Sequence, residues 1–145
     1  MPQLTRFSRI SLAGVGVVVI ATAAFLYGLF HGYFDHGQFE IKQSQSSVTN
    51  QVAMVAERSD REALGGLEYY VLIGDHVFTP VELRHAYYSS AVAFSTSSDC
   101  LALRWDGPNR LIVRCNNSTV DKDHINAQRR QVGNISIAYE NIELK

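Results

Sequence analysis

The sequence lacks the short motifs that identify common enzymes and metal sites. It contains no HExxH or CxxC motif, no Walker A or Rossmann glycine pattern, and no serine in a G-x-S-x-G elbow. His36, His76 and His124 each follow an aspartate directly. Neighbouring residues on a strand point to opposite faces, however, so this adjacency is not the geometry of a catalytic triad. We therefore predict no catalytic residue, no metal site and no cofactor.

A basic excess is also missing from the chain beyond residue 34. All 14 acidic residues but only 11 of the 13 basic residues lie there, which gives this part a charge of −3 with neutral histidines. Domains that bind nucleic acid or adhere to anionic membranes carry a positive excess. The charge therefore argues against both kinds of partner.

The most prominent feature that is present is one long apolar run. Ile10–Phe30 comprises 21 residues without a charge, and a helix of about 20 residues crosses the hydrocarbon core of a bilayer. Arg6 and Arg9 precede the run, and such residues stay on the cytoplasmic side. We predict a single-pass protein with a cytoplasmic segment over residues 1–9 and a transmembrane anchor over residues 10–34. The remainder would lie outside the inner membrane, in the periplasm.

A cleaved signal peptide is the alternative to this anchor. Ala21-Thr22-Ala23 has the small-x-small form of a cleavage site, but the apolar run continues beyond it to Phe30. A signal peptide turns polar at its cleavage site, so we favour an uncleaved signal anchor.

Three small residues in the predicted anchor recur every four positions. Ala24, Gly28 and Gly32 would lie on one helix face, where a second helix could approach closely. This face would allow a homodimer through the membrane helix. The alternative is that small residues are simply common in membrane spans.

Short runs of alternating apolar and polar residues, bounded by turn residues, fill the rest of the chain. This pattern predicts a small, mainly antiparallel β domain over residues 51–145, either a sandwich or a partly open barrel. A linker and a first strand precede it over residues 35–50.

Four segments beyond residue 34 are harder to assign. Gln43–Asn50 is polar and is expected to be a linker or loop. Val81–Leu83, after Pro80, is interpreted as a strand segment. Glu57–Leu64 is the only segment with the pattern of a short soluble helix, and a loop fits it equally well. Asn116–Gly133 has few apolar side chains and is expected to be a long solvated loop.

A hairpin is predicted around Asp106–Asn109, and two registers compete for it. The first places Cys100 opposite Cys115. The second, shifted by one residue, places five large apolar side chains on one face: Leu101, Leu103, Trp105, Leu111 and Val113. We favour the second because each such side chain contributes about 1.5–3 kcal/mol when buried. A bulge before Leu101 would still bring the cysteines together, as expected for a structural disulfide in an oxidising compartment.

The favoured register gathers Arg104, Arg110 and Arg114 on the opposite face of the hairpin. Like charges on neighbouring strands are unfavourable without partners. Two interpretations stay open. Carboxylates of Glu68, Glu140 or Glu143 could neutralise an ordinary solvated face, or the arginines could form a docking patch for an acidic protein or an anionic ligand.

The order of these features resembles small bacterial membrane-anchored proteins of unknown function. The similarity is carried by the apolar anchor and by Ala53–Arg58 (AMVAER), Leu101–Val113 (LALRWDGPNRLIV) and Ile135–Ile142 (ISIAYENI). This resemblance implies an anchored outer domain and supplies no catalytic residues.

From these observations we expect a non-enzymatic, membrane-anchored protein that binds another protein. Three alternatives stay open. They are an immunity-type protein that neutralises a toxin, an accessory subunit of a membrane complex, and a small hydrolase with a site assembled from distant residues.

Overall fold

The structure is a computed structural model that describes residues 4–30, 37–60 and 66–145. The chain divides into two units, residues 1–35 and residues 36–145, and each is described by itself. The first unit contains helix α1 (Leu4–Phe30), on which apolar side chains such as Val17, Val18 and Val19 are exposed. Within the described part of the chain, no helix has both the length and the apolar character needed to cross a membrane.

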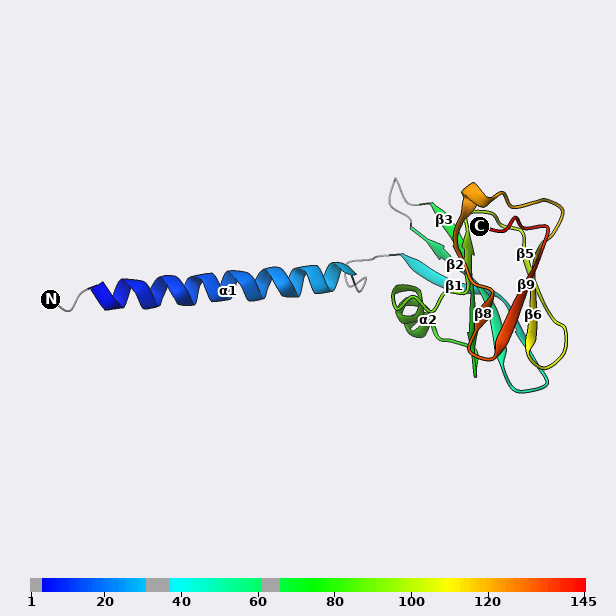
Figure 1. Ribbon diagram of the computed structural model, residues 1–145, viewed down its shortest axis with the longest axis horizontal. Coiled ribbons are helices and arrows are strands. Elements are labelled where there is room, and N and C mark those ends of the chain that lie inside the picture. Colours follow the sequence, from blue (N-terminus) through cyan, green and yellow to red (C-terminus); the bar gives the residue numbers. More distant parts are fainter. Residues whose placement is uncertain (1–3, 31–36, 61–65) are drawn as a thin grey trace. The chain divides into compact units, whose positions relative to one another are not determined.

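The second unit is a β domain built from two sheets and a helix (Figure 1). Sheet A has the order β1-β2-β3-β4-β7 and consists of β1 (Gln38–Ser46), β2 (Val52–Ser59), β3 (Leu67–Gly74), β4 (Phe94–Thr96) and β7 (Ile125–Gln128). Sheet B has the order β5-β6-β9-β8 and consists of β5 (Leu101–Trp105), β6 (Arg110–Cys115), β8 (Gln131–Val132) and β9 (Ile135–Glu140). Strands β6 and β9 run parallel, and the other neighbouring pairs run antiparallel. A small, mainly antiparallel β domain is thus confirmed, as two separate sheets that do not close into a barrel.

Apolar side chains are buried on both faces of sheet A. The first core lies between the sheets and joins Val71 and Phe94 of sheet A to Leu111 and Val113 of sheet B. A second core lies on the other face of sheet A and includes Met54, Tyr70 and Leu72. Strands β2 and β3 are therefore buried on both faces, which explains their nearly continuous apolar sequences.

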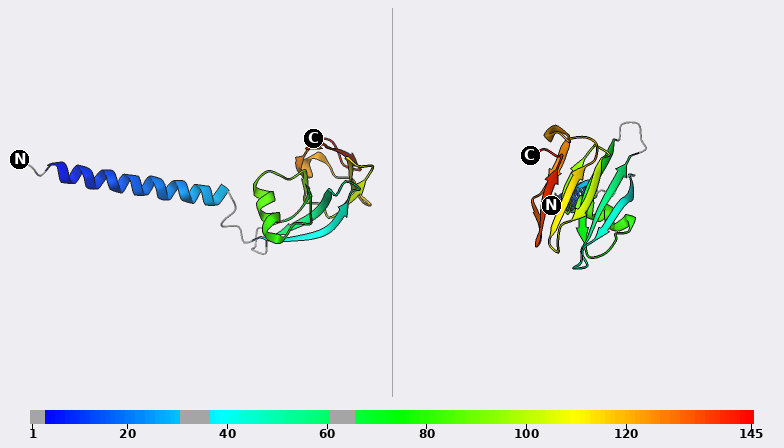
Figure 2. Two further views of the ribbon diagram at one scale, coloured as in Figure 1. Left: turned by 90° about the horizontal axis from the view of Figure 1, so that it is seen from below. Right: turned by 90° about the vertical axis from the view of Figure 1, so that its right-hand side faces the viewer.

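Helix α2 (Pro80–Tyr88) covers the second core. Figures 1 and 2 show it on the side of sheet A that faces away from sheet B. Thr79 caps the helix and forms a capping box with Glu82, while Pro80 occupies the first turn. The prediction of a strand segment at Val81–Leu83 was therefore wrong, because the capping signal outweighs a short apolar run.

Three further assignments need correction. Strand β1 continues to Ser46, so only the end of Gln43–Asn50 is a loop. Residues 57–59 of the expected helix belong to β2, and residues 61–65 lie outside the described residues. Asn116–Gly133 is not one solvated loop, because it contains the 3-10 helix η1 (Lys122–His124), β7 and β8. Buried Val120 and Ile125 anchor this segment to the core between the sheets.

The hairpin β5–β6 has the register that the apolar pattern favoured. Leu103 lies opposite Val113 and Trp105 lies opposite Leu111. Leu103 and Val113 are buried between the sheets, and Trp105 packs against the same core. The binary pattern therefore determined the register, as expected when one face of a strand pair is buried.

Candidate functional site

The three arginines predicted to share a face do so on the outer side of sheet B. Arg104 of β5 lies opposite Ile112 of β6, and Arg110 and Arg114 flank Ile112 along β6. All three arginine side chains are exposed, whereas Ile112 is only 4% exposed. We call Arg104, Arg110 and Arg114 the arginine face. The long stems of the arginines are suited to shield an apolar residue between them while their charged ends stay in water.

Two carboxylates partly neutralise the arginine face. Arg104 forms an ion pair with Glu140 at 3.6 Å, and Arg110 forms one with Asp106 at 3.5 Å. About half of each of these side chains is exposed, so each pair contributes little to stability. Arg114 makes no ion pair with any residue in the described ranges. The face therefore keeps a positive excess and could exchange its weak internal pairs for the carboxylates of a partner.

The predicted cysteine pair is brought together at the start of the hairpin. The Sγ atoms of Cys100 and Cys115 are at bonding distance, 2.14 Å. Cys115 lies opposite Leu101, one residue after Cys100, and the Asn116 amide donates a hydrogen bond to the Cys100 carbonyl. The two cysteines are therefore offset by one residue at the end of a regular ladder. The bulge we expected before Leu101 is not needed.

The proposed helix-packing face is only partly described. Ala24 is exposed and Gly28 is half-buried within α1. Gly32, the third member, lies outside the described residues. The homodimer through the membrane helix therefore stays a prediction.

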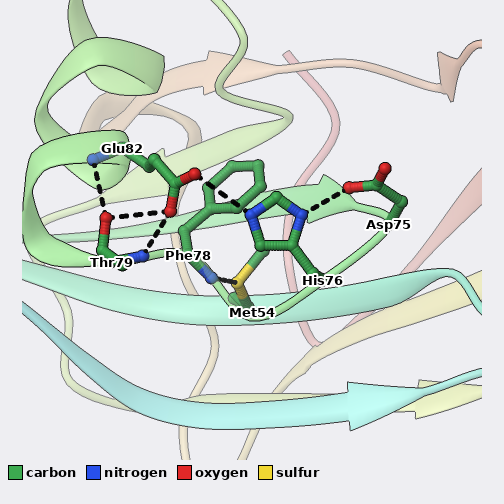
Figure 3. Close-up of polar contacts among 6 residues, drawn as sticks. All are labelled: Met54, Asp75, His76, Phe78, Thr79 and Glu82. Carbon is green, nitrogen blue, oxygen red and sulfur yellow. Dashed lines mark hydrogen bonds and ion pairs between the residues drawn. The ribbon is translucent and has the colours of Figure 1, made fainter.

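A cluster of titratable groups lies at the start of α2 (Figure 3), where the sequence analysis identified only an adjacent Asp-His pair. His76 contacts Asp75 through Nδ1 at 2.6 Å and Glu82 through Nε2 at 3.1 Å. The hydrogen bond to Asp75, followed by that to Glu82, raises the pKa of His76. Its ring also stacks at a tilt on Phe78, with 5.2 Å between centroids.

Glu82 belongs both to this cluster and to the helix cap. Its Oε2 accepts hydrogen bonds from the Thr79 amide at 2.7 Å and the Thr79 hydroxyl at 2.8 Å. These two bonds and the contact with His76 lower the pKa of Glu82 to about 2. The hydrolase alternative expected a histidine beside a serine, whereas both ring nitrogens of His76 contact carboxylates. Through these contacts the cluster links the β3–α2 loop to the helix. It does not resemble a nucleophilic site.

A third group of polar side chains lines a cleft that sequence reasoning missed. Glu68 of β3 accepts hydrogen bonds from the Tyr87 hydroxyl of α2 and from the Asn126 side-chain amide of β7. These residues are far apart in the sequence, and no local pattern links them. Burial and the bond to Glu68 raise the pKa of Tyr87, so its phenol remains a neutral donor at neutral pH.

No protein-family model, curated protein or solved structure matches this chain at a significant level.

Proposed function

We propose that this chain is a non-enzymatic binding protein, held in the inner membrane by a single span, whose β domain recognises an acidic protein in the periplasm. The observation that carries the proposal is the arginine face. Three arginines from two adjacent strands occupy the outer side of sheet B, where all three are exposed. A positive surface that meets an acidic partner increases the association rate and the specificity of binding more than it increases the affinity.

The shape of the face also suits a docking surface. Sheet B has a buried inner side and an open outer side, so its strands provide a firm base for the arginine side chains. The ion pairs of Arg104 and Arg110 are already half-exposed, and exchanging such pairs for intermolecular ones costs little. Arginine is also enriched at protein interfaces because its planar group binds carboxylates in a bidentate manner.

The membrane part of the proposal is supported by the sequence and by the surface of α1. Val17, Val18 and Val19 are at least 60% exposed, and successive helix positions lie about 100° apart, so apolar groups point in several directions. A helix that is apolar on more than one side is normally covered by protein or by lipid. Arg6 and Arg9 before the run favour a cytoplasmic location for that end.

Charge reversal on the arginine face tests partner recognition. A photo-crosslinking residue placed at Ala138, which lies opposite Ile112 on the same face, should give a discrete adduct in native membranes. In the triple variant R104E/R110E/R114E we expect that adduct to fall at least tenfold. The matched control is K122E/R130E/K145E, which changes the net charge equally at other exposed positions.

The control variant should keep the adduct at its original level. Equal loss in both triple variants would mean that net charge matters and the face does not. An unchanged adduct in R104E/R110E/R114E, with an unaltered thermal unfolding curve, would contradict the proposal.

A further inference from the structure

A cleft opens on the α2 side of sheet A, beside the C-terminal end of the helix. Helix α2 packs over β1, β2 and β3, and the floor beyond it contains Ser95 of β4 and its partner Ala127 of β7. Tyr87, Val92 and Arg129 line the cleft as well. Its volume is about 410 Å³, within the range of about 300–1,000 Å³ that is typical of small-molecule sites.

Glu68 provides a carboxylate that is fixed in place. Its Oε2 accepts from the Tyr87 hydroxyl, and its Oε1 accepts from Asn126 Nδ2 at 2.9 Å. Strand β7 carries a register shift that leaves Asn126 without a partner on β4, and such bulges re-aim side chains near binding sites. Both donors are neutral, and each carboxylate oxygen can accept a further bond.

Arg129 provides a positive charge in the same cleft. Its Nη2 donates to the Ser90 carbonyl, and its backbone amide donates to the Ala93 carbonyl at 2.8 Å. These bonds hold the residue to the loop after α2. No carboxylate of the described ranges forms an ion pair with Arg129, and its guanidinium has further donors to offer.

Tyr70 lies next to this cleft, in the core under α2, where its ring contacts that of Tyr87. Tyr70 is opposite Ser95 in the sheet, and its ring is 5.3 Å from that of Tyr87. Its hydroxyl is buried and has no hydrogen-bond partner in the described ranges. Unpaired buried polar groups are rare in native proteins, but Tyr70 does not line the cleft, so its hydroxyl is not one of the proposed ligand contacts.

We propose that this cleft binds a free α-amino acid. The ligand's ammonium group would donate to Glu68, its carboxylate would accept from Arg129, and its side chain would lie against Tyr87 and Val92. A site that fixes one carboxylate and one guanidinium complements a zwitterion better than it complements a simple cation or anion. The proposal goes beyond protein recognition at the arginine face, because the cleft lies on sheet A and the arginine face on sheet B.

Calorimetry on the full chain in detergent micelles tests this site, starting with L-phenylalanine. Its matched probes are phenethylamine, which lacks the carboxylate, and 3-phenylpropionate, which lacks the ammonium group. We expect saturable binding of L-phenylalanine, or of another of the standard amino acids, and at least tenfold weaker binding of the probes that lack one charge. No saturable binding of any standard amino acid, or equal binding of a matched probe, would overturn the proposal.

Two variants link the binding to the named residues. Glu68→Gln keeps the shape of the side chain and removes its charge. Arg129→Gln changes an exposed residue, so it still tests the site if Glu68→Gln folds poorly. Each should weaken binding at least tenfold, whereas Glu40→Gln, at an exposed position on β1, should leave it unchanged. Undiminished binding in Arg129→Gln would contradict the assignment of Arg129 as the group that binds the ligand's carboxylate. Since none of these changes touches the arginine face, the outcome is independent of the crosslinking test.

Discussion

Trp105 Nε1 donates a hydrogen bond of 3.0 Å to the main-chain carbonyl of Gln45. This bond joins β5, at the edge of sheet B, to β1, at the edge of sheet A. The Thr49 hydroxyl makes a second link when it donates to the Pro108 carbonyl at 3.0 Å. The two sheets are therefore held together along this side by polar contacts as well as by the core between them.

Trp105 contributes to stability through both its ring and its N–H group. Trp105→Phe keeps an aromatic ring and should cost about 1 kcal/mol of unfolding free energy, the usual net value of one hydrogen bond. Trp105→Ala also removes the contact with the core and should cost about 3 kcal/mol, the lower end for large aromatic truncations, because Trp105 is only half-buried. Urea denaturation measures both. Equal stability of the three proteins would contradict the assigned face of the hairpin.

Reduction of the Cys100–Cys115 pair should lower the melting temperature of the β domain. The pair closes a loop with a sequence separation of 15, and a loop of that size corresponds to about 3 kcal/mol through the entropy of the unfolded chain. The double variant C100S/C115A should melt at the temperature of the reduced protein and show no response to a reducing agent. A melting temperature that is the same with and without reductant would show that the bond contributes nothing.

The contribution of His76 to stability should depend on pH. Its raised pKa means that the folded state binds the proton more tightly, so the contribution is complete below about pH 6.5 and is lost as pH rises through the folded pKa. The lowered pKa values of Asp75 and Glu82 act in the opposite sense, since their contribution is lost as pH falls toward about 2. The window for the whole cluster is therefore about pH 4.5–6.5.

His76→Gln should accordingly destabilise the protein most within that window and progressively less above it, as measured by urea midpoints across pH. In Glu82→Gln, an NMR titration should show the His76 pKa moving down toward its ordinary value. A constant difference between wild type and His76→Gln at all pH values would show that the ion pairs do not carry the effect.

Gly74 allows the Phe78 ring to pack against the end of β3. A Cβ atom at residue 74 would lie 2.6 Å from Phe78 Cε1, so the ring would have to shift. Gly74→Ala should cost about 1–3 kcal/mol, as for other forms of overpacking. Gly66→Ala is the matched control, because its Cβ would meet nothing within 4 Å. Equal stability of the two variants would show that Phe78 adjusts freely.

The sequence predicted best those parts of the fold that depend on local periodicity. The alternation in Leu101–Trp105 and Leu111–Cys115 gave the correct register and placed the three arginines on one face. It did so because a strand with one buried side tolerates no shift by one residue. The cysteine pair was predicted from the oxidising compartment and an expected bulge before Leu101, and the pair forms without that bulge.

Long-range geometry could not be predicted in the same way. Helix α2 was missed because its signal lies in the cap at Thr79 and Glu82, while only Leu83 and Ala86 of the helix are buried. The Glu68 cleft was missed because Glu68, Tyr87 and Asn126 meet only through sheet order and a bulge. Parallel pairing of β6 with β9 likewise depends on the path of the whole chain between them.

The most direct test of the central proposal is the topology of the chain in a bacterial inner membrane. Alkaline phosphatase, which is active only outside the cytoplasm, and green fluorescent protein, which fluoresces only inside it under standard export, would each be fused after Lys145. We predict that the phosphatase fusion is active and that the green fluorescent protein fusion does not fluoresce. Both fusion proteins should remain in the membrane fraction after a carbonate wash. A fluorescent fusion together with an inactive phosphatase would contradict the anchored periplasmic domain and, with it, the proposed class of partner.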